Sequence, residues 1–162
     1  MIIRDETAGD EAGIRAVLVA AFPTPAEADL VEALRRDGDT VSSLVAEAGG
    51  TIVGHALFSR MAAPFRALGL GPVAVSPARQ RTGVGSRLIE AGLTRAAADG
   101  YDAVFVLGDP AYYRRFGFDP ALAEGFSSPY AGPHFMVTSL GDAPLPAIRG
   151  TVAYAPAFAA LG

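Results

Sequence analysis

The chain has no cysteine among its 162 residues. This absence excludes a disulfide framework, a metal site built on thiolates and covalent catalysis through a cysteine nucleophile. It also suits a reducing compartment, so we expect a cytoplasmic protein. Histidine is scarce as well: His55 and His134 are the only two and stand far apart, which makes a metal site a poor expectation.

Positive charge is not in excess either. Arginine and lysine together number 13 against 17 acidic residues, which gives a net charge of -4. Domains that bind nucleic acid usually carry a basic face that neutralises phosphates, so we expect no nucleic-acid partner.

No apolar run is long enough to span a bilayer, and the acidic start "MIIRDETAGDEAG" lacks the basic and apolar segments of a signal peptide. We therefore expect no membrane partner. The length suits one compact domain with a full core, and we expect residues 1–162 to form it.

The order of hydrophobic patterns predicts an α+β fold. Apolar residues at helical spacing predict helices over 7–22, 23–39 and 82–100, and a short helix over 110–118 ends at a glycine. Extended runs predict strands at 1–6, 40–48, 51–61, 66–75, 101–109, 134–140 and 148–154. The glycine pair at 49–50 is typical of a hairpin turn. We expect a mixed, mostly antiparallel sheet with one central parallel strand-helix-strand crossover.

A glycine-rich loop joins the strand at 66–75 to the next helix. Gly83 and Gly85 let main-chain N–H groups face the loop interior, and the helix N-terminus adds partial positive charge. Arg79, Arg81 and Arg87 surround this loop, and guanidinium groups match phosphate oxygens well. The pattern indicates a pyrophosphate site, although two glycines would equally serve a tight turn and close helix packing.

Two common nucleotide motifs do not fit this loop. The template G-x-x-x-x-G-K-[ST] requires a Gly-Lys pair, which the chain lacks. The dinucleotide fingerprint G-x-G-x-x-G fails at its third glycine, where Leu88 stands. Neither a nucleoside triphosphatase nor a dinucleotide-binding fold is therefore favoured.

The stretch from Gln80 to Gly85 resembles the Q/R-x-x-G-x-G/A signature of the GNAT superfamily of N-acetyltransferases. The preceding Val75-Ser76-Pro77 and the later "AYYRRFGF" match the family's neighbouring patterns in order and spacing. The segments "LGDPAYYRRFGF" and "GTVAYAPAF" are similar to a bacterial subgroup of predicted N-acetyltransferases. The resemblance covers the whole chain and implies a GNAT-like fold.

The resemblance also implies acetyl-CoA as co-substrate, held where two parallel strands splay apart. Main-chain groups of Val73, Ala74 and Val75 would hold the pantetheine arm, and the N–H of Val75 could stabilise a tetrahedral oxyanion. The residues expected at the pyrophosphate and the entrance are Gln80, Arg81, Thr82, Gly83, Val84, Gly85 and Ser86. The acceptor amine would attack the thioester directly in a ternary complex, without an acyl-enzyme.

Tyr113 matches the family's tyrosine, which would lie beside the cofactor and protonate the departing thiolate. Tyr112 is the alternative for this role. An alkylamine with a pKa of about 10.4 must lose a proton before it attacks, so a general base is needed. His55 and Glu47 are the candidates that we name for it. Asp109, an ordered water and, with less support, His134 are the other possibilities.

Other functions stay open on the sequence alone. A domain of the same fold could bind acyl-CoA as a sensor or partner module without turnover, and a structural protein without ligand would make the loop pattern a coincidence. The acceptor could be a small molecule, a peptide or a protein, and a homodimer is plausible. The irregular segment 121–135, rich in Gly, Pro and Ser, is of the kind that shapes substrate choice beside a site.

Overall fold

A computed structural model describes residues 1–161. The main sheet contains the strands in the order β1-β2-β3-β4-β5-β7, and β9 also pairs with β3. The strands are β1 Ile2–Asp5, β2 Thr40–Ala48, β3 Thr51–Ala62, β4 Ala67–Val75, β5 Ala103–Leu107, β7 Phe135–Ser139 and β9 Ala153–Tyr154. The helices are α1 Glu11–Ala21, α2 Ala26–Asp37, α3 Val84–Ala98, α4 Pro110–Tyr113 and α5 Pro120–Ala123.

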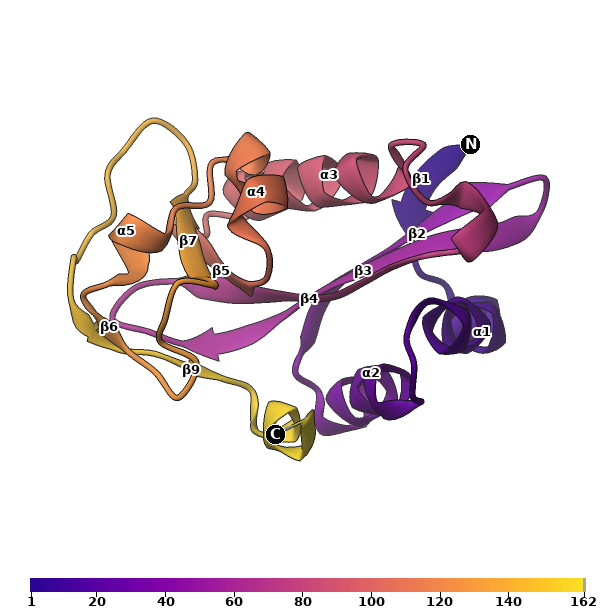
Figure 1. Cartoon of the computed structure of the whole chain (residues 1–162), viewed down its shortest axis with the longest axis horizontal. Coiled ribbons are helices and arrows are strands. Elements are labelled where there is room, and N and C mark those ends of the chain that lie inside the picture. The colour runs from indigo at the N-terminus through magenta and orange to yellow at the C-terminus, as the bar shows by residue number, and fades with distance from the viewer. Residues whose placement is uncertain (162) are drawn as a thin grey trace.

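The strand directions confirm the predicted fold class. Every pair in the main sheet is antiparallel except β4 with β5, and α3 is the crossover between those two strands. Helix α3 covers one face of the sheet, and α1 and α2 cover the other (Figure 1). The C-terminal 3-10 helix Pro156–Leu161 packs on α2. No helix within residues 1–161 is both long and apolar enough to cross a membrane.

Glycines end the elements where the sequence predicted. Gly38 stops α2 in the left-handed conformation, with φ of 76°, and its N–H satisfies carbonyls of the last turn. Gly49 and Gly50 turn the β2–β3 hairpin with φ of 56° and 80°. Gly117 closes the segment that begins with α4, again at positive φ. Because these conformations disfavour other residues, the glycines fix where α2, β2 and the segment after α4 end.

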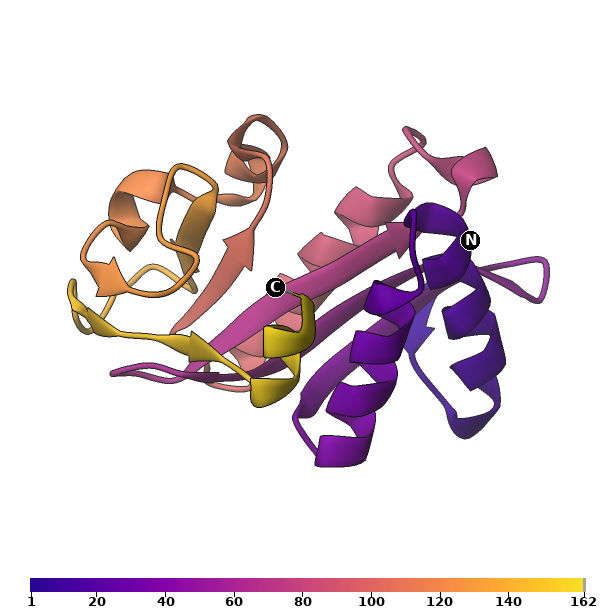
Figure 2. The ribbon, with the colours of Figure 1, turned by 60° about the horizontal axis from the view of Figure 1, so that its bottom comes forward.

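Strands β4 and β5 pair for only part of their length. Their register runs from Ala67 opposite Ala103 to Leu70 opposite Val106 and then stops. Beyond Leu70, Gly71 and Pro72 together oppose the single residue Leu57 of β3, which is a β-bulge. A bulge bends its strand and increases the twist, so β4 continues to Val75 while β5 diverges from it (Figure 2).

The last strand of the sequence differs from the prediction. Instead of one run over 148–154, two short strands form: β8 Gly150–Thr151 pairs in parallel with β6 Phe126–Ser127, and β9 pairs with β3. Gly150, with φ of 148°, starts this segment, and the buried Val152 separates the two strands. The chain therefore crosses from a small two-stranded sheet to the main sheet within five residues, 150–154.

Candidate functional site

The loop between β4 and α3 contains two residues at positive φ. Arg81 has φ of 65°, and Gly83, which precedes the first residue of α3, has φ of 92°. A Cβ at Gly83 would have no heavy atom within 4 Å, so the glycine is required by its backbone conformation and not by crowding. The left-handed residue turns the chain directly into the helix.

The turn leaves main-chain donors free. The first helical bond of α3 runs from the N–H of Arg87 to the carbonyl of Gly83, and within residues 1–161 no backbone carbonyl accepts from the amides of residues 82–86. Unpaired amides at the start of a 15-residue helix, together with its dipole, bind anions. The loop thus has the geometry of a phosphate site.

A concavity of about 440 Å³ lies over this loop. It is lined by Val75, Arg79, Gln80, Arg81, Gly83, Val84, Gly85, Ser86, Tyr112 and Arg115. Arg115, which the sequence analysis missed, places its guanidinium 4.5 Å from the centre of the Tyr112 ring. Arg87 and Thr82, which were also predicted here, are not among the lining residues. The hydroxyl of Thr82 donates to the carbonyl of Arg79. Three arginines therefore surround the free amides.

Gly85 has a different role from Gly83. Its backbone is helical, but a Cβ there would lie 3.2 Å from the Tyr112 hydroxyl, which is 3.3 Å from the Ser86 Oγ. The absence of a side chain at position 85 thus lets α4 approach α3 closely. Both glycines of the motif are explained, one by conformation and one by proximity.

The unpaired half of β4 presents alternate main-chain groups to the gap. The N–H of Ser76 donates to Val53 of β3, so the main-chain groups of Val75 point away from β3, and those of Val73 do the same by alternation. The carbonyl of Val75 accepts from the Gln80 side chain at 3.1 Å. Ala74 differs, because its main chain faces β3 and its side chain is buried under α1 and α2. Of the three predicted residues, Val73 and Val75 face the opening.

Tyr113 lies on the β5 side of the gap. Its ring packs against Gly108, just beyond the end of β5, and makes edge contacts with Tyr112 and Phe118. Burial raises the pKa of its phenol to about 12, with a smaller contribution from Tyr112. The hydroxyl therefore stays protonated, and able to donate, throughout the neutral range.

Residues 12–118 match the model of the Acetyltransferase (GNAT) family. The chain belongs to the GNAT family. It is 36% identical over 160 residues to the uncharacterized N-acetyltransferase YhbS of Escherichia coli (strain K12), with 95% of this chain and 96% of that protein covered. It is 39% identical over 150 residues to YjhQ of the same strain, also called an uncharacterized N-acetyltransferase, with 84% and 82% covered.

Two solved GNAT structures resemble the whole chain. The crystal structure of Escherichia coli YhbS in complex with CoA has a TM-score of 0.93 at 35% identity and covers 99% of this chain and 93% of that one. A GNAT acetyltransferase from Brucella melitensis in complex with acetyl-CoA has a TM-score of 0.81 at 38% identity, with 97% of each chain covered. Structures of the same family in two ligand states thus share this fold.

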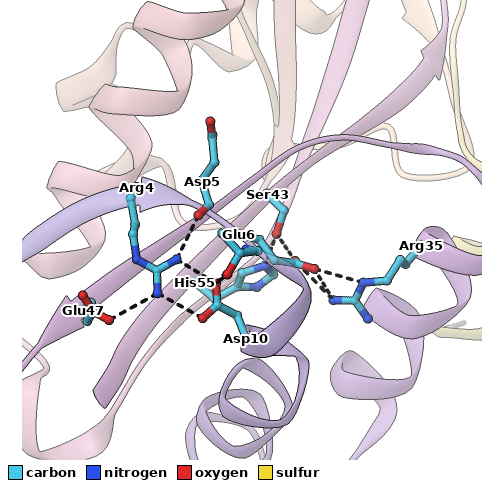
Figure 3. A network of polar contacts seen from close by, with 9 residues as sticks. Arg4, Asp5, Glu6, Asp10, Arg35, Ser43, Glu47 and His55 are labelled. Carbon is cyan, nitrogen blue, oxygen red and sulfur yellow. Dashed lines mark hydrogen bonds and ion pairs between the residues drawn. The ribbon is translucent and has the colours of Figure 1, made fainter. Parts of the chain in front are cut away.

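His55 of this GNAT protein does not reach the loop concavity. Its side chain is fully buried on β3, in register with Val45 and Ala74, which both pack under α1 and α2. Its Nε2 lies 2.8 Å from Ser43 Oγ, whose hydroxyl in turn contacts Glu6 at 2.6 Å (Figure 3). An acceptor amine could not contact this ring, so its position argues against His55 as the general base.

Burial lowers the pKa of His55 to about 4, from 6.5. Between pH 6.5 and about 4, the imidazole is protonated in the unfolded chain but neutral in the folded chain. The free energy of unfolding is therefore highest above pH 6.5 and decreases as the pH falls to about 4. We expect a loss of about 3 kcal/mol in the free energy of unfolding across this window. Urea denaturation at successive pH values measures it.

A His55→Asn variant should lose this slope between pH 6.5 and 4, whereas a variant of the exposed His134, His134→Gln, should keep it. The carboxyl of Asp10 does not interfere, because a hydrogen bond from Arg4 holds its pKa well below its usual range. An equal slope in all three proteins would contradict the assignment.

The other predicted bases are also engaged elsewhere. Glu47 forms an ion pair with Arg4 at 3.3 Å, in the network around Asp10 (Figure 3). The carboxylate of Asp109 accepts from the N–H of Ala111 and caps α4, while His134 is exposed and its carbonyl accepts from Gly108. The structure therefore does not bring these residues together with the loop.

Proposed function

We propose that this GNAT protein is an acetyl-CoA-dependent N-acetyltransferase that transfers the acetyl group directly to an amine in a ternary complex. The observation that carries the proposal is the free amides of the β4–α3 loop beside the unpaired half of β4. The CoA and acetyl-CoA complexes of the two similar GNAT structures support the same ligand. A cytoplasmic location and a homodimer stay predictions.

The residues present suit the pyrophosphate and the pantetheine arm of coenzyme A. The amides from Arg81 to Ser86 would hold the pyrophosphate, and the guanidinium groups of Arg79, Arg81 and Arg115 would add charge-assisted contacts. Main-chain groups of Val73 and Val75 would pair with the amides of the pantetheine arm, much as a neighbouring strand would. The side chain of Gln80 donates to the carbonyl of Val75 and so links the loop to the end of β4.

The thioester supplies the acetyl group: the amine nitrogen bonds to the acetyl carbon, the C–S bond breaks, and coenzyme A leaves as the thiol. Tyr113 donates its phenolic proton to the departing sulfur and is reprotonated by the proton that the nitrogen loses. Because the amine enters as an ammonium ion, one further proton passes to water. The N–H of Val75, which points away from β3, would be the candidate donor to the acetyl oxygen as that oxygen gains charge.

Calorimetric titration with acetyl-CoA, beside ATP and NAD, tests the proposal. We expect binding of acetyl-CoA alone, with micromolar affinity, since the loop fits neither nucleotide motif. Release of free thiol with a panel of amines then shows turnover. Binding without thiol release would favour a non-catalytic acyl-CoA sensor, and absence of binding would overturn the proposal.

A further inference from the structure

Arg115 is held in one orientation on the α4 side of the loop concavity. It lies in the short 3-10 turn Arg114–Phe116, which Gly117 ends at φ of 94°. Its Nε donates to the carbonyl of Tyr112 at 2.8 Å, and its guanidinium stacks over the Tyr112 ring. Because these contacts already fix the side chain, it loses little rotamer freedom when it binds a ligand.

The side chain of Tyr112 is itself a firm support. Its ring makes edge contacts with Tyr113 at 5.1 Å and with Phe116 at 5.4 Å between ring centres. Its hydroxyl lies 3.3 Å from the Ser86 Oγ in the first turn of α3. The contacts that join α4 to α3 therefore also set the position of the Arg115 guanidinium.

The two terminal nitrogens of Arg115 stay available for a ligand. Among the described residues 1–161, the Nε bond is the only hydrogen bond that this guanidinium makes, and no ion pair includes it. The charged side chains among the described lining residues are Arg79, Arg81 and Arg115, with no carboxylate beside them. Such a wall favours an anion with several negative charges.

Coenzyme A carries two separate anionic groups. The diphosphate has about two negative charges, which match the free amides of residues 82–86 and the loop arginines Arg79 and Arg81. The phosphomonoester on the 3′ carbon of the ribose has a charge of about −1.5 to −2 at pH 7. The ribose separates the two groups, so they occupy different points of the concavity. Arg115, which comes from the α4 side and not from the loop, suits the second group.

We propose that Arg115 binds the 3′-phosphate of coenzyme A and so makes the protein specific for coenzyme A over its dephospho form. The inference rests on the proposed function for the placement of the diphosphate in the loop. Since Tyr112 occupies the Nε of Arg115, the two Nη groups donate to the phosphate oxygens. Arg115 determines which cofactor binds and takes no part in the transfer of the acetyl group.

Calorimetric titration with CoA and with dephospho-CoA, which differ only in the 3′-phosphate, tests the assignment. We expect the wild-type protein to bind CoA about tenfold more tightly, the worth of one charge-assisted hydrogen bond. Arg115→Gln should weaken the binding of CoA alone and bring the ratio of the two Kd values near one. Because both ligands are titrated into the same variant, the ratio does not depend on small changes in folding.

Arg114→Gln is the matched control. It removes the same charge from the neighbouring residue, which is exposed and does not line the concavity. We expect this variant to keep the ratio of the wild type. A ratio that falls equally in both variants would attribute the preference to net charge and overturn the assignment.

The remaining outcomes separate this inference from the proposed function. Equal Kd values in the wild type, or an unchanged ratio in Arg115→Gln, overturn the role of Arg115, while binding of CoA still supports the proposed function. If Arg115→Gln weakens both ligands by the same factor, Arg115 acts on the diphosphate and the assignment is wrong. If the wild type binds neither ligand, the proposed function fails and the assignment fails with it.

Discussion

Replacing Gly83 by valine should weaken acetyl-CoA binding by about a thousandfold while the protein stays folded. The reason is conformational: a β-branched residue resists the φ of 92° that turns the loop into α3. Relaxing that turn would misdirect at least two amides, and each bond to a charged phosphate is worth about 1.5 to 3 kcal/mol. Calorimetric titration with acetyl-CoA gives the change directly.

Gly38→Val is the matched control for this substitution. Gly38 has a similar conformation, with φ of 76°, and a Cβ there would also meet no atom within 4 Å, but it ends α2. The two variants should lose similar stability in thermal denaturation, and only Gly83→Val should lose its ligand. Equal affinities for acetyl-CoA would remove the loop as the pyrophosphate site.

Tyr113→Phe should lower kcat by about two to three orders of magnitude with little change in the Kd for acetyl-CoA. The substitution keeps the ring packed against Gly108 and Phe118 and removes only the hydroxyl. General acids of this kind contribute about 10² to 10⁴ to the rate. Thiol release under saturating acetyl-CoA measures kcat, and calorimetry measures the Kd.

Tyr112→Phe separates the two neighbouring tyrosines. Tyr112 lines the loop concavity and contacts Ser86, so its hydroxyl should matter to binding of the cofactor more than to turnover. If Tyr113→Phe keeps full kcat and Tyr112→Phe does not, Tyr112 is the acid. If neither variant loses activity, water protonates the thiolate.

Most of the fold followed from local signals in the sequence. Gly38, Gly49 and Gly50 adopt the left-handed conformation that ends the preceding helix or strand. The early helices and the hairpin could therefore be placed to within a few residues. The C-terminal run could not, because its division between β8 and β9 depends on pairing with β6 and with β3, far away in the chain. Patterns of alternation do not specify which partner a strand finds.

The candidate site divides in the same way. The loop around Gly83 is contiguous in sequence, so its motif could be recognised without coordinates. Arg115 gave no such signal, because it follows α4 in the sequence and only the close approach of α4 to α3 brings it to the loop concavity. For His55 the sequence suggested too much. An imidazole suits a general base, but the strand pairing buries this side chain under α1 and α2.

The bulge at Gly71 and Pro72 lies where the pairing of β4 with β5 ends, so no ladder between these strands would have to break for a pantetheine arm to enter. The backbone loses little conformational entropy on association, and more of the contact energy remains as affinity. The rate of entry should therefore be set by diffusion and by electrostatic attraction to the loop arginines, and not by a slow opening of the sheet.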